Sequence, residues 1–272
     1  MKMTLLDTLF ILSLVILTIG YILPIYVMFV TSLKTPLEIT QRTYLIPGEP
    51  LQFQNYIRAF ELIFPSLINS SIITISVTAI STFIGGLNGY FLSRYKSRLT
   101  KVLFIFMVIG LFIPYQVILI PLVQIMAATK LALTYLGLIL SYIILNVPLA
   151  STLMGTFFFS LPRELEESAE IDGASRIGIF FKIISPIAAP AYASTSIIIF
   201  TQVWNEFLLA LTLSTPYTTP ITVKLAEIKG SYVALYNLQM AAALLSTMVP
   251  LLLFLFLGKY FVRGILAGAL KG

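Results

Sequence analysis

The chain has 272 residues, of which 58% are hydrophobic and only 10% charged, a balance typical of integral membrane proteins rather than soluble domains. It contains no cysteine and no histidine, which excludes disulfides, thiol nucleophiles, histidine bases and Cys/His metal sites. The net charge of +6 forms no continuous basic stripe, so it indicates membrane topology rather than nucleic-acid binding.

Apolar segments long enough to cross a bilayer recur along the chain. A spanning helix needs roughly 20 mostly apolar residues, because lipid offers the backbone no hydrogen-bond partners. The pattern favours an all-α membrane protein over a β-barrel. We expect one transmembrane domain over residues 1–272, with six transmembrane helices at Thr8–Ser32, Leu67–Leu92, Val102–Ala127, Tyr135–Phe159, Pro186–Leu213 and Met240–Gly258. The first is too long for a signal-peptide core, so it is expected to remain as a helix.

The distribution of lysine and arginine predicts which loops face the cytoplasm. With both termini inside, the inner segments hold 11 of the 17 basic residues, although the outer loops are longer in total. The eleven are Lys2, Arg94, Lys96, Arg98, Lys101, Arg163, Arg176, Lys182, Lys259, Arg263 and Lys271. The sequence therefore predicts a multi-pass protein of the cell (plasma or inner) membrane with cytoplasmic termini. Residues 160–185 would then be cytoplasmic, and residues 33–66 and 214–239 would lie outside.

A short acidic segment interrupts the apolar pattern between the fourth and fifth spans. A proline and three glutamates suit the start of a helix, and Gly173 suits its end. At 100° per residue Glu166, Glu167 and Glu170 share one face, and each repulsive pair costs a few tenths of a kcal/mol. A basic partner surface would relieve that repulsion. The alternative is a solvated helix helped only by a pair between Arg163 and Glu167.

The spacing in this segment resembles the EAA loop of permease subunits of binding-protein-dependent ABC importers. That motif reads E-A-A, three residues, Gly, nine residues, then I-x-L-P. This chain has Glu167-Ser168-Ala169, then Gly173, then Ile183-Ile184-Ser185-Pro186, with serine replacing the middle alanine and the leucine. Further segments are similar to the sugar-importer branch that includes the smaller maltose permease subunit. They are Asn69-Ser70, Pro114, Pro121-Leu122, Trp204-Asn205-Glu206 and the ending at residues 264–272.

The resemblance implies that this chain forms a translocation path together with a second permease subunit. It also implies two ATPase subunits, which would bind ATP and Mg, an extracytoplasmic sugar-binding protein, and contact with membrane lipid. The chain has no phosphate-binding loop, so it should neither hydrolyse ATP nor hold a cofactor itself. The residues that the resemblance assigns to ATPase coupling are Glu167, Ala169, Asp172, Gly173 and Pro186.

Polar and aromatic residues inside the spans are candidates for a sugar path. Sugars need apolar faces for stacking and amide or hydroxyl groups for hydrogen bonds. The candidates are Tyr115, Gln116, Asn146, Gln202, Trp204 and Asn205. Each is also compatible with helix packing or an interfacial belt. Glu206, the one acidic residue well inside a span, is either a hydrogen-bonded structural contact or part of that path.

Two other classes of protein agree less well with the sequence than a permease subunit does. An ion-coupled secondary transporter is the alternative, but a single intramembrane carboxylate, no histidine and no visible inverted repeat argue against it. An intramembrane enzyme would need a grouped acid, base and nucleophile, and the sequence shows no such set.

Overall fold

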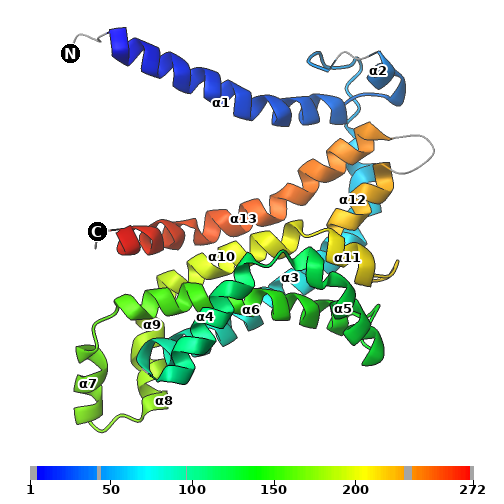
Figure 1. The fold of residues 1–272 in the computed structure, drawn as a ribbon. Helices are drawn as coiled ribbons and strands as arrows, with labels where there is room; N and C mark the ends of the chain where they lie inside the picture. The colour runs from blue at the N-terminus through cyan, green and yellow to red at the C-terminus, as the bar shows by residue number, and fades with distance from the viewer. Residues whose placement is uncertain (1–4, 42–43, 96, 230–234, 270–272) are drawn as a thin grey trace. The chain divides into compact units, whose positions relative to one another are not determined.

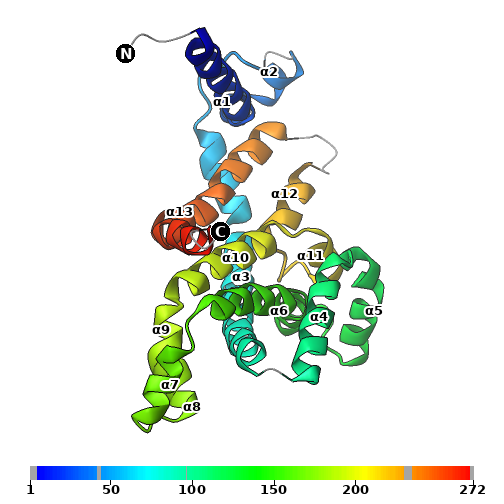
Figure 2. The same cartoon turned by 60° about the vertical axis from the view of Figure 1, so that its left-hand side comes forward.

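The computed structural model describes residues 5–41, 44–95, 97–229 and 235–269, and the regular elements in these ranges are helices (Figures 1 and 2). Four of them are long and apolar enough to cross a membrane: α1 (Leu5–Ser32), α3 (Gln54–Arg94), α6 (Tyr135–Ser160) and α13 (Tyr236–Ala269). They contain the first, second, fourth and sixth expected spans. Two bent pairs of helices bring the number of candidate spans in the described residues to as many as six, which agrees with the predicted all-α membrane class.

The third expected span, Val102–Ala127, is not one continuous helix. α4 (Arg98–Phe112) ends before Ile113, and α5 (Tyr115–Ala128) leaves at an angle of 104°. The ring of Pro114 removes an N–H group and disfavours helical backbone at the residue before it. Ile113 is accordingly extended, with φ −81° and ψ 119°. The third expected span is therefore present as a bent pair of helices that is broken at Pro114.

The fifth expected span, Pro186–Leu213, is interrupted twice. A helical run leads into it through α8 (Arg176–Ile179), the π-helix η1 (Phe180–Ile184) and α9 (Ser185–Ile187). α10 (Ala189–Asn205) follows at an angle of 74° to this run, with a proline in its first turn. Glu206 is then extended, with φ −70° and ψ 134°, and separates α10 from α11 (Leu208–Leu213). The fifth expected span is therefore also present as a bent series of helices rather than as one straight helix.

The chain divides into two compact units, and the single-domain organisation stays a prediction. The first comprises residues 1–67 and 224–248. In it, the side-chain amide of Asn55 donates to the carbonyl oxygens of Ser32 at 2.8 Å and Lys34 at 2.9 Å. The short α2 (Pro36–Thr40) starts with a capping box, in which the backbone N–H and hydroxyl of Thr35 donate to Glu38 and lower the pKa of its carboxyl group.

The second unit comprises residues 68–223 and 249–272, and it holds both candidate sites. Its core is an apolar cluster contributed mainly by α3, α5, α6, α10 and α11. Glycines let α3 and α6 approach closely, since an added Cβ at Gly85 would lie 2.4 Å from the Cβ of Ala150. Nearer the middle of α3, Asn69 donates to the carbonyl oxygens of Tyr217 and Thr219 at 3.0 Å each. These bonds attach the segment before α12 (Ile221–Lys229) to the helices.

Three basic residues used in the topology prediction fall outside the described residues: Lys2, Lys96 and Lys271.

Candidate functional site

The acidic segment forms a short helix, α7 (Glu164–Ile171), that lies beside α8 (Figures 1 and 2). Its C-terminus is closed by a Schellman motif. The N–H of Ala174 donates to the carbonyl of Ala169, and the N–H of Gly173 donates to that of Glu170, both at 3.0 Å. Gly173 has φ +82°, a left-handed conformation that glycine adopts without steric cost. The predicted helix and its glycine stop are confirmed.

The five residues assigned to ATPase coupling have different surroundings. Glu167, Asp172, Gly173 and Pro186 are exposed. Ala169 is buried in a cluster that includes Phe158, Ile179, Phe180 and Ile184. The alanine of the motif therefore faces the interior of this chain, which requires a small residue there, while the glutamate two positions earlier faces outward.

The acidic face of α7 finds basic partners within this chain. Glu166 pairs with Nε of Arg94 and accepts a 2.9 Å hydrogen bond from the hydroxyl of Tyr90. Glu170 lies 3.8 Å from Nε of Arg176, with both side chains exposed. Among the described residues no ion pair joins Arg163 to Glu167, and Arg163 instead donates to the carbonyl of Arg94 at 3.4 Å. The Arg163–Glu167 pair belonged to the alternative of a solvated helix, and that alternative is not supported here, because α7 folds back against the end of α3.

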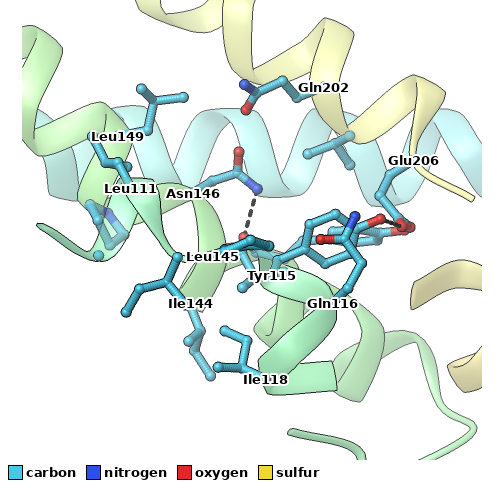
Figure 3. Close-up of a pocket in the computed structure, with 16 residues that line it drawn as sticks. Leu111, Tyr115, Gln116, Ile118, Ile144, Leu145, Asn146, Leu149, Gln202 and Glu206 are labelled. Carbon is cyan, nitrogen blue, oxygen red and sulfur yellow. Dashed lines mark hydrogen bonds between the residues drawn. The ribbon is translucent and has the colours of Figure 1, made fainter. Parts of the chain in front are cut away.

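A second candidate site is a cavity of about 660 Å³ between the bend of α4 and α5, the middle of α6 and the end of α10 (Figure 3). Four of the six predicted sugar-path residues line it, namely Tyr115, Gln116, Asn146 and Gln202. The break at Pro114 helps to form the cavity, since it turns α5 away from α4. Apolar side chains such as Leu111, Ile118, Ile144 and Leu149 complete its walls.

Trp204 and Asn205 do not line this cavity. Trp204 is 4% exposed and stacks on Phe200, with ring centres 5.6 Å apart and planes 11° from parallel. The side-chain amide of Asn205 donates back to the carbonyl of Thr201 at 2.9 Å. At 100° per residue, Gln202 and Glu206 share a helix face that these two residues do not. The run Trp204-Asn205-Glu206 therefore divides three ways: Glu206 borders the cavity, Trp204 is packed against Phe200, and Asn205 is exposed.

Glu206 joins three helices at the edge of the cavity. One carboxylate oxygen accepts the hydroxyl of Tyr115 and the N–H of Leu209, both at 2.9 Å. The other accepts the hydroxyl of Tyr142 at 2.6 Å and the N–H of Ala210 at 3.1 Å. The carboxylate thus caps α11 and holds α5 and α6. Tyr142 was missed in the sequence, although a tyrosine hydroxyl inside an apolar span needs such a partner.

Neither site contains a metal-binding arrangement of side chains. Within the described ranges, no three acidic groups gather closely enough to hold a metal ion.

A helical membrane protein with a polar-lined cavity and an exposed acidic helix between two spans has the features of a transport permease. The comparisons with known proteins define the class further. This chain belongs to the family described as binding-protein-dependent transport system inner membrane component, whose model matches residues 81–267. The predicted membership of this permease family is thereby confirmed, and the family consists of permease subunits rather than catalytic enzymes.

Individual relatives extend the match over nearly the whole chain. The glucose import system permease protein GlcU of Saccharolobus solfataricus is 34% identical over 264 residues, covering 94% of this chain and 92% of the relative. The sulfoquinovosyl glycerol transport system permease protein SmoH of Agrobacterium fabrum is 33% identical, with 97% and 93% covered. A solved bacterial ABC transporter involved in alginate import matches with a TM-score of 0.79, covering 96% of this chain and 99% of that chain. Its sequence identity of 22% supports likeness of fold alone.

Proposed function

We propose that this chain is a transmembrane permease subunit of an ATP-driven sugar importer, and that it forms a translocation path with a second permease. The family match over residues 81–267 carries the proposal. The sugar assignment is supported by relatives named for glucose import, for arabinooligosaccharide transport and for sulfoquinovosyl glycerol transport. An ion-coupled secondary transporter is not favoured, because it has no support in this family.

The cavity in the second unit offers the chemistry that a sugar requires. The ring of Tyr115 provides an apolar face, and the exposed amides of Gln116 and Gln202 provide donors and acceptors for hydroxyl groups. Asn146 is less available, since it is buried and its amide donates to the carbonyl of Tyr142 at 2.8 Å. We assign Tyr115, Gln116 and Gln202 to the sugar path, with Asn146 as a supporting residue.

Coupling to ATP hydrolysis is assigned to the exposed face around α7. Glu167, Asp172 and Gly173 would contact an ATPase subunit, and Pro186 would lie at the edge of that contact. Two such subunits would bind ATP and Mg, and closure of the ATPases would act on the permease through α7. Ala169 would serve by keeping α7 close to its own core.

The importer would be completed by an extracytoplasmic sugar-binding protein. A bacterial alginate transporter solved in complex with a periplasmic protein that carries an alginate pentasaccharide has the same fold, with a TM-score of 0.65 and 17% identity. In this chain we propose cytoplasmic termini, which place α7 on the side where ATPase subunits and ATP are found. The segment around Tyr217 would then face outward, toward the binding protein.

The proposed topology can be tested by labelling introduced cysteines, because the chain has none of its own. Ile171 on α7 is 87% exposed and Tyr217 is 88% exposed, so the two positions are matched in accessibility. In intact cells an impermeant maleimide should label Tyr217→Cys and spare Ile171→Cys, and both should react after the membrane is permeabilised. Labelling of Ile171→Cys alone in intact cells would reverse the orientation and remove the basis for ATPase docking.

A second experiment tests the partners directly. The tagged chain should co-purify with its ATPase subunits, and proteoliposomes holding the full importer should take up labelled glucose or a labelled oligosaccharide only with ATP inside. Uptake without ATPase subunits, driven by an ion gradient, would contradict the proposed function.

A further inference from the structure

We propose that Arg94 is the positioning residue that joins the coupling helix α7 to the C-terminal ends of α3 and α6, so that these three ends move as one body. Nothing in the EAA-like spacing assigns a role to Arg94, which lies 72 residues before Glu166 in the sequence. The inference rests on the proposed function in one respect only, namely that force from an ATPase subunit acts on α7.

The guanidinium of Arg94 contacts both other elements. Its Nε pairs with the carboxylate of Glu166 on α7. Its Nη1 donates to the carbonyl of Phe158 at 2.8 Å, and its Nη2 reaches the carbonyl of Leu161 at 3.5 Å. These carbonyls belong to the end of α6, where the last carbonyl groups carry partial negative charge. The carbonyl of Phe158 also accepts the N–H of Leu161 at 3.2 Å. The planar guanidinium, with five donors, can serve both elements together.

Burial makes this contact stronger than the other charged contacts of α7. The side chains of Arg94 and Glu166 are only 9% and 15% exposed, so water competes weakly for them. Arg176 and Glu170 lie 3.8 Å apart and are 72% and 52% exposed, and exposed pairs of this kind contribute little. The Arg94–Glu166 pair is therefore the one that fixes the position of α7.

Tyr90 supports the same contact from one helical turn earlier on α3. Its hydroxyl donates to Glu166 at 2.9 Å, and its ring lies 5.9 Å from the guanidinium carbon of Arg94. The ring also packs against Phe158 and Phe180, with centroid distances of 5.7 Å and 5.0 Å. We call Tyr90, Arg94 and Glu166 the Arg94 cluster. Tyr90 and Arg94 are both held by neighbouring side chains and carbonyl groups, so they fix the position of the Glu166 carboxylate.

The coupling helix needs such an attachment because it has little else to hold it. With residues Glu164–Ile171 it makes about two turns, and helices of that length are not stable alone in water. Its one buried residue is Ala169, whose methyl group provides little apolar contact. A push on the exposed face of α7 therefore reaches α3 and α6 mainly through the Arg94 cluster.

The first test measures whether α7 and α3 are rigidly joined. Spin labels are placed at Leu87→Cys on α3 and Ser168→Cys on α7, both exposed positions in a chain without native cysteine. In the permease we expect one narrow distance distribution between the labels. Glu166→Gln should broaden it at least about twofold, because a buried arginine loses its charged partner. Glu164→Gln, an exposed carboxylate on the same helix, is the matched control and should leave it unchanged. The same narrow distribution in Glu166→Gln would overturn the proposal.

The second test measures coupling in the full importer. Arg94→Gln and Glu166→Gln should still bind the ATPase subunits, but glucose taken up per ATP hydrolysed should fall about tenfold, since the motion of a loose α7 is not transmitted. Joining Arg94→Cys to Glu166→Cys with a thiol crosslinker should restore coupling if the link is mechanical. A crosslinked protein that remains uncoupled would overturn the proposal, as would normal coupling in both glutamine variants.

The two tests separate this inference from the proposed function. If the wild-type chain binds no ATPase subunit, the proposed function fails, yet the spin-label distances still decide whether the Arg94 cluster joins α7 to α3. If Arg94→Gln does not accumulate in membranes, Glu166→Gln decides the question, because it leaves the contacts between Arg94 and α6 in place.

Discussion

Glu206 illustrates how a single side chain can be charged inside a transmembrane segment. A carboxylate at the centre of a spanning helix costs roughly 2.5–3.5 kcal/mol on insertion scales. Here two tyrosine hydroxyls and two backbone N–H groups donate to it, so both oxygens are satisfied. Hydrogen bonds to a charged group are worth about 1.5–3 kcal/mol each, enough together to offset that cost.

Replacing this carboxylate should loosen the helices that it joins. In Glu206→Gln one oxygen becomes an NH₂ group that faces a tyrosine hydroxyl and an N–H donor. We expect a loss of about 1–3 kcal/mol in stability, measured as a lower unfolding midpoint of the purified chain in detergent. Gln116→Ala changes an exposed residue of the same cavity and should leave the midpoint in place. Equal midpoints for both variants would rule out a structural role for Glu206.

Gly173 is the residue at which backbone conformation limits substitution. An added Cβ there would meet no atom within 4 Å, so the cost of a side chain comes only from φ +82°. A β-branched residue pays roughly 1–2 kcal/mol in this region, while asparagine tolerates it better. Gly173→Val should therefore weaken ATPase co-purification severalfold, and Gly173→Asn should retain most of it. If the two variants behave alike, the left-handed turn does not matter for docking.

At the scale of elements, different residues interrupt the third and fifth spans, and both interruptions border the cavity. Pro114 breaks the third span through its ring, and Glu206 breaks the fifth by capping α11 with its side chain. Both breaks lie at the cavity, whose lining includes Pro114 and Glu206. Irregular backbone at membrane depth is tolerated where it borders a cavity and its polar groups are satisfied.

The close packing of α3 against α6 depends on glycine. A Cβ at Gly85 would come within 2.7 Å of the backbone carbon of Ala150, and backbone cannot move aside as a flexible side chain can. We expect Gly85→Val to destabilise the chain by about 1–3 kcal/mol through overpacking, seen as reduced yield and a lower unfolding midpoint. Gly110→Ala in α4 is the control, since its Cβ meets nothing within 4 Å. A neutral Gly85→Val would show that the two helices can separate without cost.

For the molecule as a whole, the second unit contains both the cavity and α7, the proposed coupling helix. α6 belongs to both, because its middle lines the cavity and its last carbonyls bind Arg94. Because one helix contacts both sites, movement of α7 in the proposed transport cycle can reach the cavity through α6. The cavity and α7 can be tested separately, since they share no side chain.

Substitutions around the cavity should separate sugar contact from packing. Gln116→Ala and Gln202→Ala remove exposed amides, so they should change the relative uptake of glucose, arabinose and maltose about threefold or more at normal protein level. Trp204→Ala removes a buried, stacked ring at a cost of about 3–5 kcal/mol, and should lower the protein level without changing preference. Uptake is compared at matched amounts of membrane protein. Altered preference in Trp204→Ala alone would mean that the sugar path lies on the other side of α10.

Much of this protein can be derived from local patterns in its chain. Hydrophobic length predicts the spans, because the bilayer fixes how many apolar residues a helix needs. The acidic run before Gly173 predicts the short helix α7 and its stop, because a left-handed turn favours glycine at one position. Four of the six residues predicted for the sugar path line the cavity, because side chains that need polar partners avoid lipid.

Other features depend on contacts between distant segments, which no local pattern contains. Glu166 pairs with Arg94 across 72 residues, and Glu206 meets Tyr115 and Tyr142 from two other helices. Trp204 packs against Phe200 rather than the cavity, because its position around α10, and not its chemistry, decides which neighbours it contacts. Periodicity shows which residues share a helix face, but only the packing of helices against one another decides which face borders the cavity and which charged groups find a partner.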